Sequence, residues 1–173
     1  MIQPGSAIVQ LAWVVNDLEE AAHRFHRLYG CGPFLMNRHI KLGDPRYRGA
    51  PVRTDFSTAL AQAGDVQVEL IVQHDDTPSV YRDLHPAGSE GFHHVAMIVP
   101  DVAQEVARYQ TLGFAAAFTG RFGSAEFAYV DTVPAIGHMT EILPDNAMLR
   151  GFFGMVRRAA EEWDGTDIIR ELA

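Results

Sequence analysis

The sequence of 173 residues predicts an α+β fold built from two βαβββ modules and a C-terminal helix. The first observation behind this prediction is a repeat, because residues 9–18 resemble residues 93–102. In both segments a β-branched and apolar run of strand length ends at an aspartate, Asp17 or Asp101, that can cap a helix. The second observation is that apolar residues then recur at helical spacing until a glycine. Each half therefore opens with a strand, a cap and a helix.

The rest of the first module, residues 7–72, follows from turn and strand patterns. A Gly64-Asp65 turn separates two strand-like runs, residues 54–63 and 66–72. A shorter strand is expected at residues 34–36. Residues 37–53 contain four arginines, two glycines and two prolines, and they predict a long loop. Long loops on a rigid scaffold often serve binding, which makes Arg38 and Arg53 candidates for substrate binding.

The second module, residues 92–144, repeats the plan of the first. Strands are expected at residues 115–119, 126–130 and 138–143. A connector at residues 73–91 is rich in turn residues and has one helical turn near residues 79–84. Beyond Pro144, apolar residues at helical spacing predict a C-terminal helix over residues 146–163, followed by a polar tail that is expected to fray.

Composition limits the classes of function. With 47% hydrophobic and 21% charged residues, the chain is expected to fold as one domain over residues 1–173. A net charge of −8 and the lack of a basic run disfavour nucleic acid as a partner. No segment approaches the length of a membrane span, and residues 1–7 have no basic region followed by an apolar run, so neither membrane insertion nor secretion is expected. The single Cys31 permits no internal disulfide, so a cytoplasmic location is expected.

Four polar side chains occupy equivalent positions of the two modules. Strand alternation puts Gln10 and His94 at matching places of the repeated strand. Glu69 and Glu141 match in the last strand of each module. A single Glu or Gln in a strand faces solvent more often than it binds a ligand. Two glutamates flanked by apolar residues nevertheless need a compensating partner when they are buried, and a divalent cation is such a partner.

The donor set restricts the identity of this cation. Three oxygen donors and one imidazole suit Mg²⁺, Mn²⁺, Co²⁺, Ni²⁺ or Zn²⁺. A structural zinc site of the cysteine-rich kind is excluded, because no thiolate is among the four. The sequence therefore predicts one divalent metal ion bound by Gln10, Glu69, His94 and Glu141.

With these residues and the strand that ends in Val-Asn-Asp-Leu or Val-Pro-Asp-Val, residues 7–144 resemble the vicinal oxygen chelate superfamily of glyoxalases, bleomycin resistance proteins and extradiol dioxygenases. The resemblance implies that the two modules form a curved, eight-stranded mixed sheet with a metal in its cleft. Lactoylglutathione lyase and methylmalonyl-CoA epimerase are the most similar subfamilies. The four predicted ligands are similar to those of the lyase, whereas two modules in one chain are typical of the epimerase.

The resemblance implies a metal-dependent lyase or isomerase. Such an enzyme removes a proton beside a carbonyl or thioester of a small metabolite, giving an enediolate chelated by the metal, and a homodimer is typical. Glu141 or Glu69 would be the catalytic base, with Glu141 favoured. One alternative is a metal-free protein that sequesters a small molecule. Another is an extradiol-type dioxygenase, which Gln10 argues against because the iron site of that class needs two histidines.

Overall fold

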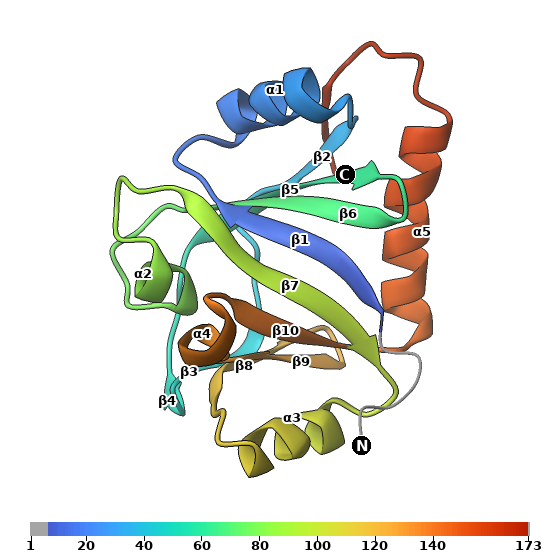
Figure 1. Ribbon diagram of the computed structural model, residues 1–173. Coiled ribbons are helices and arrows are strands. Elements are labelled where there is room, and N and C mark those ends of the chain that lie inside the picture. Colours follow the sequence, from blue (N-terminus) through green and yellow to red (C-terminus); the bar gives the residue numbers. More distant parts are fainter. Residues whose placement is uncertain (1–6, 173) are drawn as a thin grey trace.

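One mixed, curved sheet organises residues 7–172, the part of the chain that the computed structural model describes (Figure 1). Within these residues the sheet has eleven strands in the order β11-β2-β5-β6-β1-β7-β10-β9-β8-β3-β4. In chain order the elements are β1 (Ile8–Val14), α1 (Leu18–Tyr29), β2 (Phe34–Asn37), β3 (Gly43–Tyr47), β4 (Ala50–Pro51), β5 (Phe56–Ala63), β6 (Val66–Gln73), α2 (Val80–Leu84), β7 (Gly91–Val99), α3 (Val102–Thr111), β8 (Ala116–Phe122), β9 (Ala125–Val130), α4 (Val133–Ile136), β10 (Met139–Pro144), α5 (Ala147–Glu161) and β11 (Ile169–Glu171).

The predicted helix caps are confirmed in both modules. The side chain of Asp17 accepts a hydrogen bond from the backbone N–H of Glu20, and Asp101 accepts one from Gln104, each at 2.9 Å. These bonds satisfy backbone donors that the first turn of a helix leaves free. Gly30 ends α1 with a φ of +68°, a conformation that glycine adopts without steric cost.

The two modules meet at the centre of the sheet. β1 and β7, the repeated strands, pair antiparallel, and each also pairs in parallel with the last strand of its own module, β6 or β10. The registers repeat as well, since Ala12 on β1 pairs with Glu69 and Ala96 on β7 pairs with Glu141. The repeat read from the sequence is therefore a repeat in three dimensions, with the two modules related by an approximate twofold axis.

The prediction of an uninterrupted loop at residues 37–53 is wrong. Part of this segment forms the β3–β4 hairpin, and β3 pairs with β8 of the other module, with Arg46 opposite Thr119 and Tyr47 opposite Phe118. Arg48, just after β3, binds Asp83 at 2.8 Å and Asp131 at 3.1 Å. The hairpin forms because the edge of β8 offers unpaired backbone groups, a partner that local sequence does not reveal.

The tail after α5 also departs from the prediction. Instead of fraying, its residues 169–171 form β11, which pairs in parallel with β2. The two added hairpin strands and β11 raise the strand count of the described residues from the expected eight to eleven. Helix α5 agrees with its predicted range, and it packs on the sheet through a cluster of Leu35, Leu60 and Val156.

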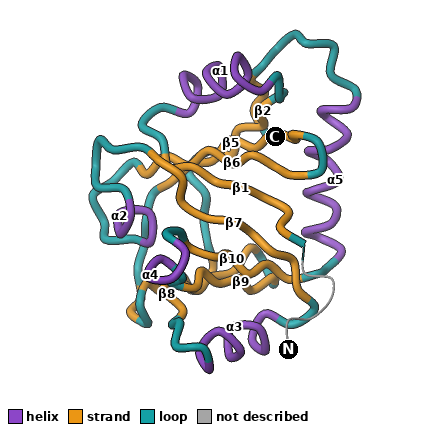
Figure 2. Tube along the Cα trace, in the orientation of Figure 1, coloured by secondary structure: helices purple, strands orange, loops and turns teal. Residues whose placement is uncertain are grey.

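The helices surround the sheet on several sides, with α1 and α3 at opposite ends of the view and α5 along one flank (Figures 1 and 2). Helix α1 and β2, β5 and β6 enclose one apolar cluster, and the second module contributes half of the buried residues of another. Among residues 7–172, no helix combines the length and the apolar character that crossing a bilayer requires.

Candidate active site

The four predicted ligands lie on four neighbouring strands in the middle of the sheet, β6, β1, β7 and β10. The register puts Ala12 between Glu69 and His94, and it puts Ala96 between Glu141 and Gln10. Because an alanine side chain is only a methyl group, space is left above Ala12 and Ala96 between the four longer predicted ligands. This pairing follows from the repeat, and it gives the site the same approximate twofold symmetry as the sheet.

Three of the four side chains come into close contact. Nε2 of His94 lies 3.5 Å from Oε2 of Glu69 and 3.4 Å from Oε2 of Glu141. His94 is completely buried, and the Glu141 residue is only 5% exposed. Gln10, Glu69 and Glu141 line the same cavity of about 220 Å³, which we call the inner cavity. The tertiary structure thus gathers residues that are far apart in the sequence.

Gln10 is held by a neighbour on β6. Its Nε2 donates to Oε1 of Gln67 at 3.3 Å, and both residues are buried. Gln67 pairs in register with Gln10 and lies on the same strand face as Glu69. With its amide nitrogen engaged, the amide oxygen of Gln10 is the atom that remains for a ligand.

His93 determines which nitrogen of His94 carries a proton. Nε2 of His93 lies 2.9 Å from the backbone oxygen of Val80, and Nδ1 of His93 lies 2.9 Å from Nδ1 of His94. A carbonyl only accepts, so Nε2 of His93 must be the donor. Burial, and next the nearby His94, lower the pKa of His93 well below its ordinary value, so its ring is neutral and its Nδ1 accepts.

The consequence for His94 is a fixed tautomer. Because Nδ1 of His93 accepts, Nδ1 of His94 must donate, and in a neutral ring this leaves a lone pair on Nε2. That Nε2 is buried without a hydrogen-bond partner among the described residues, although two carboxylates lie close to it. The His93 side chain, which alternation places on the opposite face of β7, therefore belongs to the site. The sequence contains a signal for this role only in the His93-His94 dipeptide.

The two glutamates are electrostatically coupled. Burial, and next the charge of Glu141, raise the pKa of the Glu69 carboxyl well above its ordinary value. Two carboxylates in a water-poor site repel each other, and this repulsion favours retention of a proton. A cation between them would remove the repulsion and allow both to ionise.

The residues fit a divalent cation in chemistry and in spacing. Atoms that bind one cation at about 2.1 Å lie about 3.0–3.4 Å apart, which is close to the His94–glutamate distances of 3.4 and 3.5 Å. The orphaned Nε2 of His94 and the mutual repulsion of the glutamates would both be relieved. No group of three or more histidine, cysteine, aspartate and glutamate side chains within residues 7–172 is already arranged as a metal cage. A small contraction of the cluster would therefore accompany binding.

Two tyrosines complete the site. Tyr81 on α2 and Tyr129 on β9 are buried, with ring centroids 6.2 Å apart, and Tyr129 packs edge-on against His94 at 4.9 Å. Burial raises the pKa of each phenol, and the glutamate charges raise it further. Both hydroxyls therefore stay protonated and remain hydrogen-bond donors. The sequence pattern marks neither tyrosine as a site residue, because an aromatic residue in a strand more often fills the core or a cavity wall and α2 belongs to the connector.

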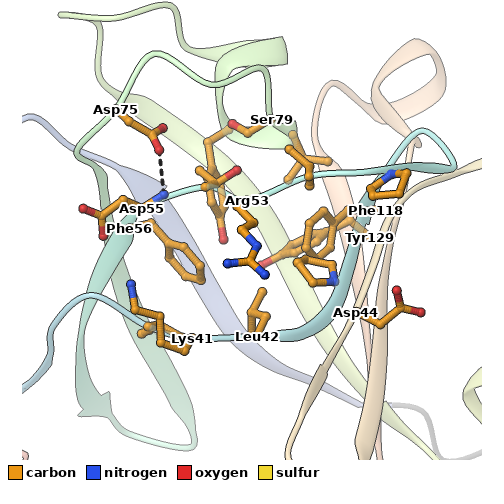
Figure 3. A pocket seen from close by; sticks show the side chains of 17 residues that line it. Lys41, Leu42, Asp44, Arg53, Asp55, Phe56, Asp75, Ser79, Phe118 and Tyr129 are labelled. Atoms are coloured by element: carbon orange, nitrogen blue, oxygen red, sulfur yellow. Dashed lines mark hydrogen bonds between the residues drawn. The ribbon is translucent and has the colours of Figure 1, made fainter.

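A second, larger cavity of about 720 Å³ opens beside the first, and we call it the outer cavity (Figure 3). It lies between residues 40–56, the connector and the second module. Figure 3 shows the guanidinium of Arg53 reaching into it. Ile40, Phe56, Tyr81 and Tyr129 line both cavities, so the two adjoin at the tyrosines.

The two predicted substrate-binding arginines lie in different places. Arg53 lines the outer cavity, so it is placed where it could contact a ligand. Arg38 lines neither cavity. Its guanidinium binds Glu171 of β11 at 2.8 Å and Glu19 of α1 at 2.9 Å, so it ties the tail to the first helix.

The fold and the site together define the class of protein. Residues 9–129 match the family model of the glyoxalase/bleomycin resistance protein/dioxygenase superfamily, and the chain belongs to this superfamily. The match covers Gln10, Glu69 and His94, whereas Glu141 lies beyond it. No curated protein sequence matches the chain.

Particular solved structures share this fold. Methylmalonyl-CoA epimerase from Mycobacterium tuberculosis superposes with a TM-score of 0.57 at 15% identity, over 83% of this chain and 91% of that one. The hypothetical protein BH1468 from Bacillus halodurans C-125 gives a TM-score of 0.59 at 12% identity, over 82% and 96%. A methylmalonyl-CoA epimerase in complex with methylmalonyl-CoA and NH4+ gives 0.54 at 17% identity, over 82% and 96%. At these identities the similarity establishes the fold.

Proposed function

We propose that the protein is a metal-dependent enzyme of the isomerase or lyase type that moves a proton on the carbon next to a carbonyl or thioester group. The observation that carries this proposal is the buried Nε2 of His94, which has no hydrogen-bond partner among the described residues and lies beside two carboxylates that line the inner cavity, while Nδ1 of the same ring contacts His93. Gln10, Glu69, His94 and Glu141 would bind one Zn²⁺, Ni²⁺, Co²⁺, Mn²⁺ or Mg²⁺. When bound, this cation supplies Lewis-acid chemistry.

The side chains of the site have the other proposed roles, which are to accept a proton, to donate hydrogen bonds and to exclude water. Glu141 or Glu69 takes the proton from the substrate carbon, since each carboxylate faces the inner cavity. The hydroxyls of Tyr81 and Tyr129 donate hydrogen bonds to a substrate oxygen that gains negative charge. The surrounding apolar side chains exclude water and so strengthen these interactions.

A thioester is the proposed substrate. One structure of similar fold is an epimerase in complex with methylmalonyl-CoA, which supports a small acyl thioester as the ligand. The outer cavity adds independent support, because about 720 Å³ is enough for a large carrier group beyond the reacting carbon. Arg53 is proposed to bind this carrier.

The test is metal content combined with proton exchange. Elemental analysis of the purified or reconstituted protein should give about one equivalent of a divalent metal, and Glu141→Ala should lose it. Glu126→Gln, at an exposed glutamate of β9, is the matched control and should keep the metal. Exchange of the α-proton of an acyl-CoA thioester in D₂O should require the metal.

Two amide variants then assign the base. Glu69→Gln and Glu141→Gln keep an oxygen donor, and the one that retains the metal but loses exchange identifies the base. A wild-type protein that binds no metal after reconstitution, and exchanges no proton, would refute the enzyme proposal. The metal-free binding protein would then be the better hypothesis.

A further inference from the structure

The inner and outer cavities adjoin at Tyr81 and Tyr129, and their walls differ in chemistry. Four side chains line both, so a ligand in one cavity touches the same residues as a ligand in the other. The proposed reacting carbon lies by Glu69 and Glu141, at the wall of the inner cavity. The side chains that line each cavity therefore indicate the chemistry of the end of the substrate that binds there.

The inner cavity is apolar apart from the site residues and a few neutral groups. Helix α5 contributes a wall, and the sheet contributes a second one of Leu60, Phe122, Phe127 and Leu143. The α5 wall consists of Met148, Leu149, Phe152 and Phe153. No lysine, arginine or histidine of the described residues lines it. An additional anionic group here would meet two glutamates without a cationic side chain, whereas an apolar group would be buried favourably.

The outer cavity offers two cations that no carboxylate neutralises. Lys41 and Arg53 line it, and neither forms an ion pair within residues 7–172. Three aspartates also line the cavity, and each already has an ion-pair or hydrogen-bond partner. Asp44 pairs with Arg46 at 3.3 Å, Asp55 bonds His39 at 2.8 Å, and Asp75 accepts the backbone N–H of Asp55 at 2.8 Å, as Figure 3 shows for the last. Lys41 and Arg53 are therefore the cationic side chains of this cavity that remain without an ion-pair partner among the described residues.

We propose that the substrate is an amphipathic thioester whose acyl end carries an apolar group larger than methyl, bound under α5, and whose carrier end is anionic, bound between Lys41 and Arg53. This inference rests on the proposed function and specifies its substrate class. The orientation is set by charge, because the anionic end has cationic partners only in the outer cavity.

The size of the inner cavity sets the size of the apolar group. An apolar cavity of about 150 Å³ holds a benzene ring, and the inner cavity measures about 220 Å³. A methyl substituent would leave most of this volume empty. An acyl chain of about six carbons, or an aromatic ring, would fill it.

The acyl end is tested by titrating the full-length, metal-supplemented protein with hexanoyl-CoA and acetyl-CoA. Each buried methylene strengthens binding about fourfold, so hexanoyl-CoA should bind at least about tenfold more tightly. Phe153→Ala enlarges the cavity and should shift the preference toward octanoyl-CoA by at least about threefold. Met155→Ala, a control on the same helix that lines neither cavity, should leave the preference unchanged. If Phe153→Ala does not fold, Phe153→Leu makes a smaller enlargement for the same comparison.

The carrier end is tested with three hexanoyl thioesters. Hexanoyl-CoA carries phosphates, S-hexanoylglutathione carries carboxylates, and S-hexanoyl-N-acetylcysteamine carries no anion. The neutral thioester should bind at least about tenfold more weakly than the better anionic one. Lys41→Met and Arg53→Met should each reduce this difference, whereas Arg157→Met, at an exposed arginine outside both cavities, should not. The stronger of the two anionic ligands identifies the carrier as phosphate-bearing or carboxylate-bearing.

Two results would overturn the inference. One is equal affinity for acetyl-CoA and hexanoyl-CoA, within about twofold, and the other is equal affinity for neutral and anionic thioesters. These affinities are independent of turnover, so they separate this inference from the proposed function. A protein that binds metal and exchanges protons but ignores chain length would refute the substrate class alone.

Discussion

His93 offers a sharp test of the site, because it should act on the metal only through His94. In His93→Phe a somewhat larger aromatic ring replaces the imidazole, and both nitrogens are lost. The carbonyl of Val80 and Nδ1–H of His94 then lose their partner in a buried place. A histidine that binds a metal commonly depends on such an outer partner, and removal of the partner lowers metal affinity about 10–100-fold. We expect the same loss here, equivalent to about 1.4–2.8 kcal/mol.

The metal-free protein should be destabilised as well. Each buried polar group left without a partner costs about 1–3 kcal/mol, so the two orphaned groups predict a loss of about 2–6 kcal/mol in the free energy of unfolding. His93→Gln is the matched rescue variant, because its amide oxygen can accept from His94 and its nitrogen can donate to Val80. It should recover part of both losses.

The assay must distinguish orientation from stability. Competition with a chelator gives the affinity for Zn²⁺ or Co²⁺, and ¹⁵N NMR of the metal-free protein reports which nitrogen of His94 is protonated. In wild type the proton should be on Nδ1, and in His93→Phe the tautomers should mix. The reasoning is refuted if His93→Phe folds and binds metal within about threefold of wild type, or if wild-type His94 carries its proton on Nε2.

Three further predictions concern residues outside the ligand set. Arg38→Met should leave thioester affinity unchanged, whereas Arg53→Met should weaken it, because of these two arginines only Arg53 lines a cavity. Equal losses of affinity in a binding titration would contradict these different roles. Burial raises the pKa of the Cys31 thiol, so the reactive thiolate is scarcer in the folded state. Modification of the folded protein by a thiol reagent at pH 8 should therefore be at least about tenfold slower than modification in urea. Equal rates would show an accessible thiol. Leu70 is fully buried, so Leu70→Ala should lower the free energy of unfolding by about 2–5 kcal/mol in urea titration. Leu28 is 68% exposed, so Leu28→Ala should change it by less than about 0.5 kcal/mol. Similar values for both variants would refute the assigned core.

The candidate site shows how far strand periodicity extends. Alternation and the repeat were sufficient to nominate Gln10, Glu69, His94 and Glu141. The structure puts an oxygen of Glu69 and one of Glu141 within 3.5 Å of Nε2 of His94, and it puts Gln10 on β1, between β6 and β7. Periodicity works here because a strand presents every second residue to one face. Applied to β7, the same rule puts His93 on the face opposite to His94. It could not show that the ring nitrogens of His93 and His94 approach each other to 2.9 Å.

The sequence by itself determined the local elements and their repetition: the capped helices, the strands that lead into them, and the equivalence of the two modules. These depend on neighbours a few residues away, whose spacing is written in the chain. Only the tertiary structure decided where unpaired edges find partners, so that β3 joins β8 and β11 joins β2. It also decided that α5 covers an apolar cavity next to one with unpaired cations. Such features depend on contacts between distant segments, because hydrogen bonding and burial of apolar surface select partners in space and not by their separation along the chain.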